Sequence, residues 1–368
     1  MGGLNGSEAR SLRETSSALR GARQAPAPVL QYCAPMQAIL AVTVPFFGLV
    51  LLGWIAARVH WLPASAIPGL NAYVLFFALP CLLFRFGSSL PLARLADPVQ
   101  LAVYLGAAGA VVAVTIAVTI ERPGRSGVDL RDAALGARVA AIPNAGFMGV
   151  PLLVALLGDA AAGPVIGAIV VDLVFTSTVC LALAQAHSHR DRAGDRSLVH
   201  SAALSLRGAL TNPLPWAIAV GAAFAAAKLE LVGPVAQIVR MLGDSATPVA
   251  LFTIGAVLWR AGDHVHTRTP LGRTLPVALI KLLVHPALVL GLGSAARALG
   301  APLPWLTLTA LTLTAALPSA SNVSVLAERY GADNGRIARI ILVSTTLAFV
   351  TFSAAAWLFG VGGPAAAR

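Results

Sequence analysis

Two proline-containing interruptions of long apolar runs carry the residues best suited to bind a ligand. The residues are Pro143, Asn144, Pro318, Ser319, Ser321 and Asn322. Proline removes a helical hydrogen bond, and in hydrocarbon the freed backbone groups need partners from protein or from a water-filled cavity. Paired breaks at matching places in two halves of a chain indicate the binding site of a transporter.

The chemistry expected at such breaks is the binding of an anion. A half-helix that begins after each proline would present unpaired N–H groups and a partial positive charge. Two such ends meeting at the bilayer midplane would hold a carboxylate, and the Asn144 side chain would donate a further hydrogen bond. The alternative is a packing kink whose freed backbone groups are satisfied by neighbouring helices.

Three ionisable residues lie within apolar runs and are candidates for ion or proton coupling. They are Asp172, Lys281 and His285. Ionisable groups at membrane depth are costly and therefore suggest function. Lys281 and His285 are four residues apart, which places both on one helix face. The alternative for this pair is snorkelling or a structural hydrogen bond.

The composition indicates a membrane protein. The chain is 57% hydrophobic and 11% charged, with a mean hydropathy of +0.80, whereas soluble domains carry about 25% charged residues. The net charge of +11 is spread over short loops, so it favours a role in topology over nucleic-acid binding, which needs a clustered basic patch. Cys33, Cys81 and Cys180 show no metal or disulfide spacing, and we expect no metal and no cofactor.

Apolar runs of about 20 residues, the length that crosses a bilayer, predict ten transmembrane helices. They lie near residues 37–57, 65–86, 98–120, 133–157, 164–186, 212–228, 240–260, 274–297, 303–327 and 337–359. The prediction is an all-α polytopic membrane protein with a first five-helix repeat at 37–186, a loop at 187–211 and a second repeat at 212–360. Because five is odd, the second repeat is inverted. Residues 1–35 form a polar tail, unless Met36 is the true start of the protein.

The two halves share a motif, A-x-P-x-x-L-F-x-x-G, at residues 78–87 and 246–255. Together with the stretches 71–77, 144–151, 281–286, 317–322 and 327–331, it resembles the auxin efflux carrier family, as a bacterial relative of the plant PIN-FORMED carriers. The resemblance implies two inverted five-helix repeats and broken helices 4 and 9 that cross at the site. It also implies a scaffold of helices 1, 2, 6 and 7 and a moving transport domain formed by the rest.

The resemblance further implies a secondary transporter that moves a small organic anion, such as an indole acid or a dicarboxylate, by alternating access. One departure concerns the second break, since the plant carriers place Asn near both breaks. Here Asn144 follows the first proline, but Ser319 follows the second and Asn322 comes four residues after it.

The alternatives to a carrier are an intramembrane enzyme and a channel. The chain has no H-E-x-x-H, G-x-S-x-G or P-loop motif, so we expect no enzyme. A channel would show a continuous polar stripe or a selectivity ring, which isolated breaks do not supply. The expected partners are the organic anion and the bilayer of the cytoplasmic (inner) membrane, with a monomer and a homodimer both open.

The orientation follows from Lys and Arg in the loops, where the odd-numbered loops carry fifteen and the other side six once the tail is set apart. By the positive-inside rule the odd-numbered loops face the cytoplasm and both termini face away from it. A single cysteine at Ser197, in a variant lacking the native cysteines, should therefore resist an impermeant thiol reagent in intact cells. Labelling before permeabilisation would show that this loop faces away from the cytoplasm and that the assigned orientation is wrong.

Overall fold

The computed structural model describes residues 28–89, 97–121, 127–190, 213–263, 271–321, 323 and 332–361. Within these ranges the regular structure is helical, and the remaining pairings are two isolated bridges, Ile120 with Val128 and Pro143 with Ser319. Residues 1–27 of the expected tail, residues 191–211 of the expected loop, and Asn322 lie outside the described residues.

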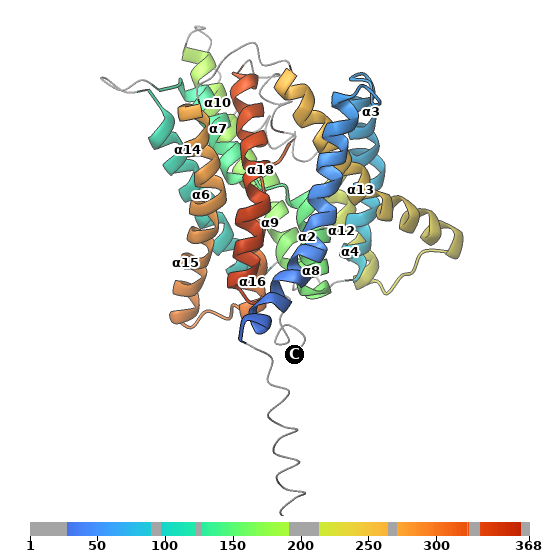
Figure 1. Cartoon of the computed structure of the whole chain (residues 1–368). Helices are drawn as coiled ribbons and strands as arrows, with labels where there is room; N and C mark the ends of the chain where they lie inside the picture. The colour runs from blue at the N-terminus through green and yellow to red at the C-terminus, as the bar shows by residue number, and fades with distance from the viewer. Residues whose placement is uncertain are drawn as a thin grey trace, which may run out of the picture.

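The helices pack side by side in one bundle (Figure 1). Those of the first half are α2 (Pro28–Arg58), α3 (Ala66–Tyr73), α4 (Leu79–Ser89), α6 (Pro98–Thr119), α7 (Leu130–Ala141), α8 (Val150–Leu157), α9 (Ala162–Val171) and α10 (Ser177–Arg190). Those of the second half are α12 (Pro213–Ala226), α13 (Gly233–Asp263), α14 (Leu271–Leu279), α15 (His285–Ala298), α16 (Trp305–Ala316) and α18 (Asn334–Leu358).

Several of these helices are joined by π-helical turns, in which an N–H bonds the carbonyl five residues back. Such turns join α3 to α4, precede α8, join α9 to α10 and join α14 to α15. Their bounds are Val74–Ala78, Ala145–Gly149, Asp172–Thr176 and Ile280–Val284, and one 3₁₀ turn, Asp159–Ala161, precedes α9.

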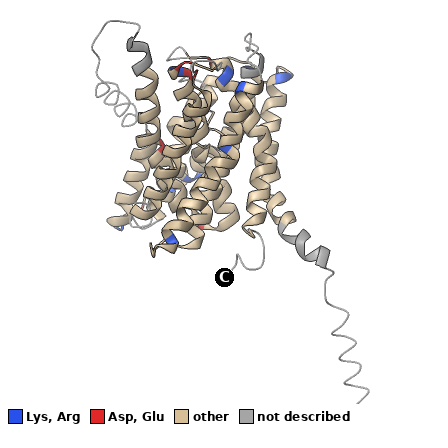
Figure 2. Cartoon of the chain, turned by 90° about the vertical axis from the view of Figure 1, so that its left-hand side faces the viewer, with Lys and Arg blue, Asp and Glu red and all other residues tan. Residues whose placement is uncertain are grey.

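Seven helical segments of the described residues are long and apolar enough to cross a membrane. Three shorter apolar segments are Ala145–Leu157, Pro213–Ala226 and Trp305–Ala316. Figure 2 shows the charged residues mostly toward the helix ends, with long uncharged stretches between them. The chain is therefore a multi-pass membrane protein, as its composition predicts. The number ten stays a prediction, because Pro143 and Pro318 interrupt two of the expected spans.

Two helices begin earlier than the hydropathy indicates. α2 begins at Pro28 rather than near residue 37, and α13 begins at Gly233 rather than near residue 240. Hydropathy marks the stretch that suits hydrocarbon, whereas a helix can extend beyond that stretch into the more polar region outside it. Pro28 and Pro234 stand in the first turns of these helices, where the fixed φ of proline is tolerated.

Close helix packing depends on two pairs of glycines. A Cβ added to Gly53 of α2 would overlap the carbonyl oxygen of Phe252 in α13, and one added to Gly255 would overlap that of Val50 in α2. α4 and α12 repeat this arrangement, since a Cβ on Gly87 would lie 2.7 Å from the Ile218 carbonyl oxygen, and one on Gly221 would overlap that of Phe84. Gly87 and Gly255 are the last residues of the repeated motif, so each copy of the motif ends at a helix crossing.

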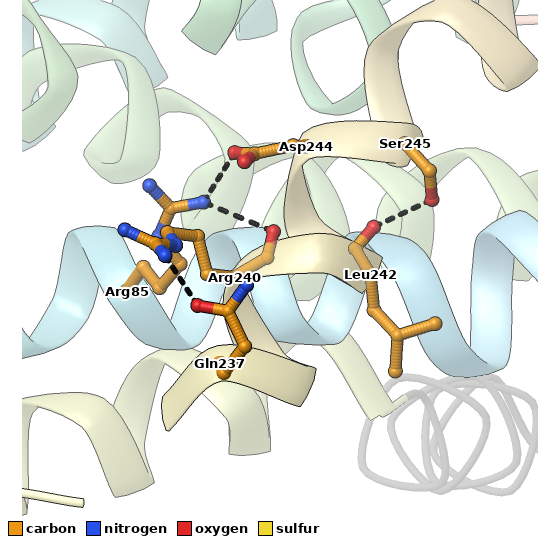
Figure 3. A network of polar contacts seen from close by, with 6 residues as sticks. All are labelled: Arg85, Gln237, Arg240, Leu242, Asp244 and Ser245. Atoms are coloured by element: carbon orange, nitrogen blue, oxygen red, sulfur yellow. Dashed lines mark hydrogen bonds and ion pairs between the residues drawn. The ribbon is translucent and has the colours of Figure 1, made fainter. Parts of the chain in front are cut away.

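An ion pair links α4 to α13 (Figure 3). Arg85 Nη1 lies 2.6 Å from Asp244 Oδ1 and donates to the Arg240 carbonyl at 3.4 Å, while Arg240 donates to Gln237. The paired side chains are 39% and 64% exposed, and exposed pairs typically contribute up to about 1 kcal/mol. The ion pair is therefore a small contribution to holding α4 against α13.

Gly255→Ala should destabilise the protein, because its methyl group would force α2 and α13 apart. Overpacking of this kind costs about 1–3 kcal/mol. The measurement is the thermal unfolding midpoint of purified protein in detergent. Gly48→Ala on α2 is the matched control, since nothing lies within 4 Å of a Cβ there, and equal midpoints for the two variants would contradict the close approach.

Candidate functional site

The two proline breaks meet each other. α7 ends at Ala141 and α16 at Ala316, and each is followed by extended backbone. The Asn144 N–H donates to the Pro318 carbonyl at 2.8 Å, and the Ala320 N–H donates to the Ile142 carbonyl at 3.1 Å. The two segments thus form a short antiparallel bridge that pairs four of the backbone groups at the breaks.

This bridge changes the expected source of donors for an anion. The backbone N–H of Asn144 is committed to Pro318, and the N–H of Ser319 donates to Ser344 Oγ at 3.3 Å. The N–H groups at the start of the second half-helix therefore begin one residue later, in the π-helical turn Ala145–Gly149 that follows the first break. The side chains at the crossing are deeply buried, since Asn144 is 3% exposed and Ser319 is 1% exposed.

A cavity of about 70 Å³ lies against the first break. Its polar lining is Arg138, Asn144, Asp172 and Ser177, and Ala320 contributes from the second break. Its apolar wall includes Leu75 and Leu79 from the α3–α4 segment and Leu214 from α12. The cavity therefore lies between the crossing and the helices that pack through Gly87 and Gly221.

Asp172 anchors a buried polar network beside this cavity. Its Oδ2 accepts from the Tyr104 hydroxyl at 3.0 Å, and its Oδ1 accepts from Thr176 Oγ1 at 3.2 Å. Its backbone carbonyl accepts from Ser177 Oγ at 2.6 Å. Ser177 Oγ in turn accepts from Arg138 Nη2 at 3.1 Å. The network joins α6, α7 and the α9–α10 segment.

Lys281 and His285 lie at the second break rather than at the cavity, and both are fully buried. Lys281 Nζ donates to the Ala315 carbonyl at 2.7 Å and lies 3.2 Å from His285 Nδ1. In an unbroken helix the Ala315 carbonyl would accept from the N–H of Ser319, which here turns to Ser344. The lysine thus supplies the donor missing from the end of α16, where the helix dipole also favours a cation.

The structure therefore divides the residues singled out by sequence. Pro143, Asn144 and Asp172 line the cavity; Pro318 and Ser319 form the other half of the bridge; Ser321 is buried beside it. His285 connects the two groups, because its ring lies 5.6 Å from that of Tyr104, the residue that donates to Asp172. Asn322 lies outside the described residues.

Two polar residues of the site were missed by the sequence reasoning. Arg138 was counted as a loop charge, but it belongs to α7, is 5% exposed and lines the cavity. Its place inside the predicted span 133–157, six residues before Asn144, was the available signal. Tyr104 carries no such signal, because a tyrosine in an apolar helix is an ordinary residue for an interface or a core.

Comparison with known proteins agrees with a transport role for this fold. The family described as "Membrane transport protein" matches residues 38–356. A protein of Rhizobium meliloti (strain 1021) named "Putative malonate transporter" is 28% identical over 330 residues, which cover 89% of this chain and 98% of that protein.

The Lys281 contact predicts a coupled stability effect. Lys281→Met should destabilise the protein by about 1–3 kcal/mol, because the buried Ala315 carbonyl loses its donor and Asp172 loses a nearby cation. Lys281→Met combined with Asp172→Asn should cost less than the sum of the two single changes, since both charges then disappear together. Thermal unfolding in detergent measures this, with Lys228→Met as the exposed control. Strict additivity would show that the two charges do not interact.

Proposed function

Since the chain belongs to the membrane transport protein family, we propose that it is a secondary carrier that moves a small organic anion across the cytoplasmic membrane by alternating access. The observation that carries this proposal is the position of the cavity. It is bounded on one side by the hydrogen-bonded breaks and on the other by Leu75, Leu79 and Leu214. Displacement of one side against the other would expose it to opposite faces of the membrane.

The proposed architecture has ten spans in two inverted repeats, residues 37–186 and 212–360, joined by a cytoplasmic loop at 187–211. Three shorter apolar segments, counted with the seven long ones, support this number. α7 and α8 form the broken fourth span, α12 forms the sixth, and α16 opens the ninth. The glycine pairs link the second span of each repeat to the first span of the other, which supports a scaffold of spans 1, 2, 6 and 7.

The proposed substrate is a short dicarboxylate, such as malonate. The relative named for malonate supports this choice over an indole acid. Size supports it as well, because a cavity of about 70 Å³ is well below the roughly 300 Å³ of pockets for drug-sized ligands.

Two groups would hold the two carboxylates. One carboxylate would accept from the Asn144 side chain and from the first N–H groups of the turn Ala145–Gly149, where the helix dipole adds partial positive charge. The other would pair with the Arg138 guanidinium, whose planar fork matches a carboxylate. Arg138, Asn144 and the start of the turn line the same cavity of about 70 Å³, so both groups can reach one short ligand. Ser319, Ser321 and Asn322 would complete the site from the second break.

Asp172 would couple a proton to the anion. Its carboxylate lines the same cavity and would repel a bound anion in a medium of low dielectric constant. Uptake of a proton would remove that repulsion, while Lys281 and His285 would keep the second break in register with the network.

The proposal predicts selectivity for acids that depends on two side chains. In proteoliposomes a short dicarboxylate should be carried, while its diamide and a diamine of equal length should not. Asn144→Ala should weaken binding about 10- to 150-fold, the loss of one hydrogen bond to a charged group. Arg138→Gln should weaken binding of the dicarboxylate more than that of a monocarboxylate, and Arg240→Gln is the exposed control.

The same vesicles test the coupling, because Asp172→Asn should remove the dependence of dicarboxylate uptake on an imposed pH gradient. Transport of the diamide as fast as the acid, or normal binding by Asn144→Ala, would contradict the proposed site.

A further inference from the structure

A second cavity, of about 110 Å³, lies where the end of α6 meets the first turns of α14 and α18. It is next to the backbone bridge between Ile120 and Val128. The arginines around it belong to the loops that the positive-inside bias assigns to the cytoplasm. The transport site proposed above does not use this cavity.

The charged residues that line this cavity are Arg273 and Arg336, and none of its described lining residues is acidic. Asp132 and Asp333, two acids that interact with Arg336, accept hydrogen bonds from backbone groups. Asp132 Oδ1 accepts from the Asp333 N–H at 2.9 Å, and Asp333 Oδ1 accepts from the Arg336 N–H at 2.9 Å, which caps α18. These carboxylates keep their negative charge, but neither lines the cavity, so the charged groups that line it are the two guanidinium groups.

The Arg336 guanidinium is fixed by its neighbours, and one of its N–H donors has no acceptor among the described residues. The residue is 1% exposed, and its Nη1 donates to the Asp132 carbonyl at 3.0 Å. Its guanidinium lies against Gly136, where an added Cβ would be 3.0 Å from Nη1. Within the part of the chain that the structure describes, Arg336 Nε has no hydrogen-bond partner. A buried donor without an acceptor costs about 1–3 kcal/mol, so an acceptor from outside the chain would stabilise it.

The first turn of α14 adds partial positive charge beside the same cavity. Gly272 and Arg273 line the cavity, and α14 begins at Leu271. The N–H groups of a first helical turn have no partner within the helix and carry partial positive charge. Two guanidinium groups and a helix N-terminus thus converge on one small volume.

We propose that this cavity binds a phosphate group. Guanidinium groups bind phosphate oxygens with strong, charge-assisted hydrogen bonds, and basic pockets between transmembrane helices on the cytoplasmic side bind anionic lipid headgroups. The volume suits a single phosphate rather than a nucleotide. The phosphate of an anionic phospholipid and free inorganic phosphate share this chemistry, and either would tie α6, α14 and α18 together.

The test uses the full chain purified in detergent and compares two ligand sources by thermal unfolding. One arm titrates sodium phosphate against sodium chloride at equal ionic strength. The other adds phosphatidylglycerol, with phosphatidylcholine as the neutral comparison. The wild-type midpoint should rise in at least one arm, and the arm that responds identifies the source.

Arg273→Gln should weaken the apparent affinity in that arm about tenfold or more. Arg273 is an exposed residue in the first turn of α14, so this variant should fold. The control is Arg58→Gln, which changes an exposed arginine expected at the same membrane face and should respond like wild type. The absence of a rise in both arms, or an equal response of Arg273→Gln and wild type, would overturn the phosphate site. Neither result bears on dicarboxylate transport, which the vesicle assay measures separately.

Discussion

The structure depends on one constraint, that backbone polar groups freed by two prolines in an apolar environment must find partners. The two breaks satisfy each other, through the Asn144 N–H with the Pro318 carbonyl and the Ala320 N–H with the Ile142 carbonyl. Two further groups pair with side chains, as Ser344 accepts from the Ser319 N–H and Lys281 donates to the Ala315 carbonyl. The positions of α14, α15 and α18 around the second break follow from these contacts.

The mutual pairing also limits how the proposed carrier could move. Two half-helices joined by backbone hydrogen bonds cannot separate without leaving buried donors and acceptors unpaired, at a cost of about 1–3 kcal/mol for each group. The breaks of the two halves should therefore travel as one body. Relative motion is then easier at the other wall of the cavity, where Leu75, Leu79 and Leu214 offer apolar contacts that can slide without breaking hydrogen bonds.

The sequence predicts the parts of this structure that follow from local chemistry. Proline positions identified both breaks, and hydropathy identified most of the spans. Residue-level partners could not be predicted, because they depend on which helices become neighbours. Arg138 shows the difference, since an arginine near a helix end is an ordinary topology signal until packing places it against a cavity. Lys281 was recognised as unusual by its depth, but only the fold shows that its partner is a carbonyl of α16.

The π-helical turns that follow Asn144 and that contain Asp172 and Lys281 have a further consequence for the geometry of this site. A π-helical turn contains one residue more than the α-helical turn it replaces. In the turn Ala145–Gly149 the extra residue is taken up within the turn, so deleting one residue there would leave α8 facing as it does and would shift the side chains of the turn itself. Ala145, Gly146 and Phe147 of this turn line the cavity, so the cavity wall would change at these residues. The shape of the cavity is thus set by the extra residue of the π-helical turn as much as by the identity of the side chains.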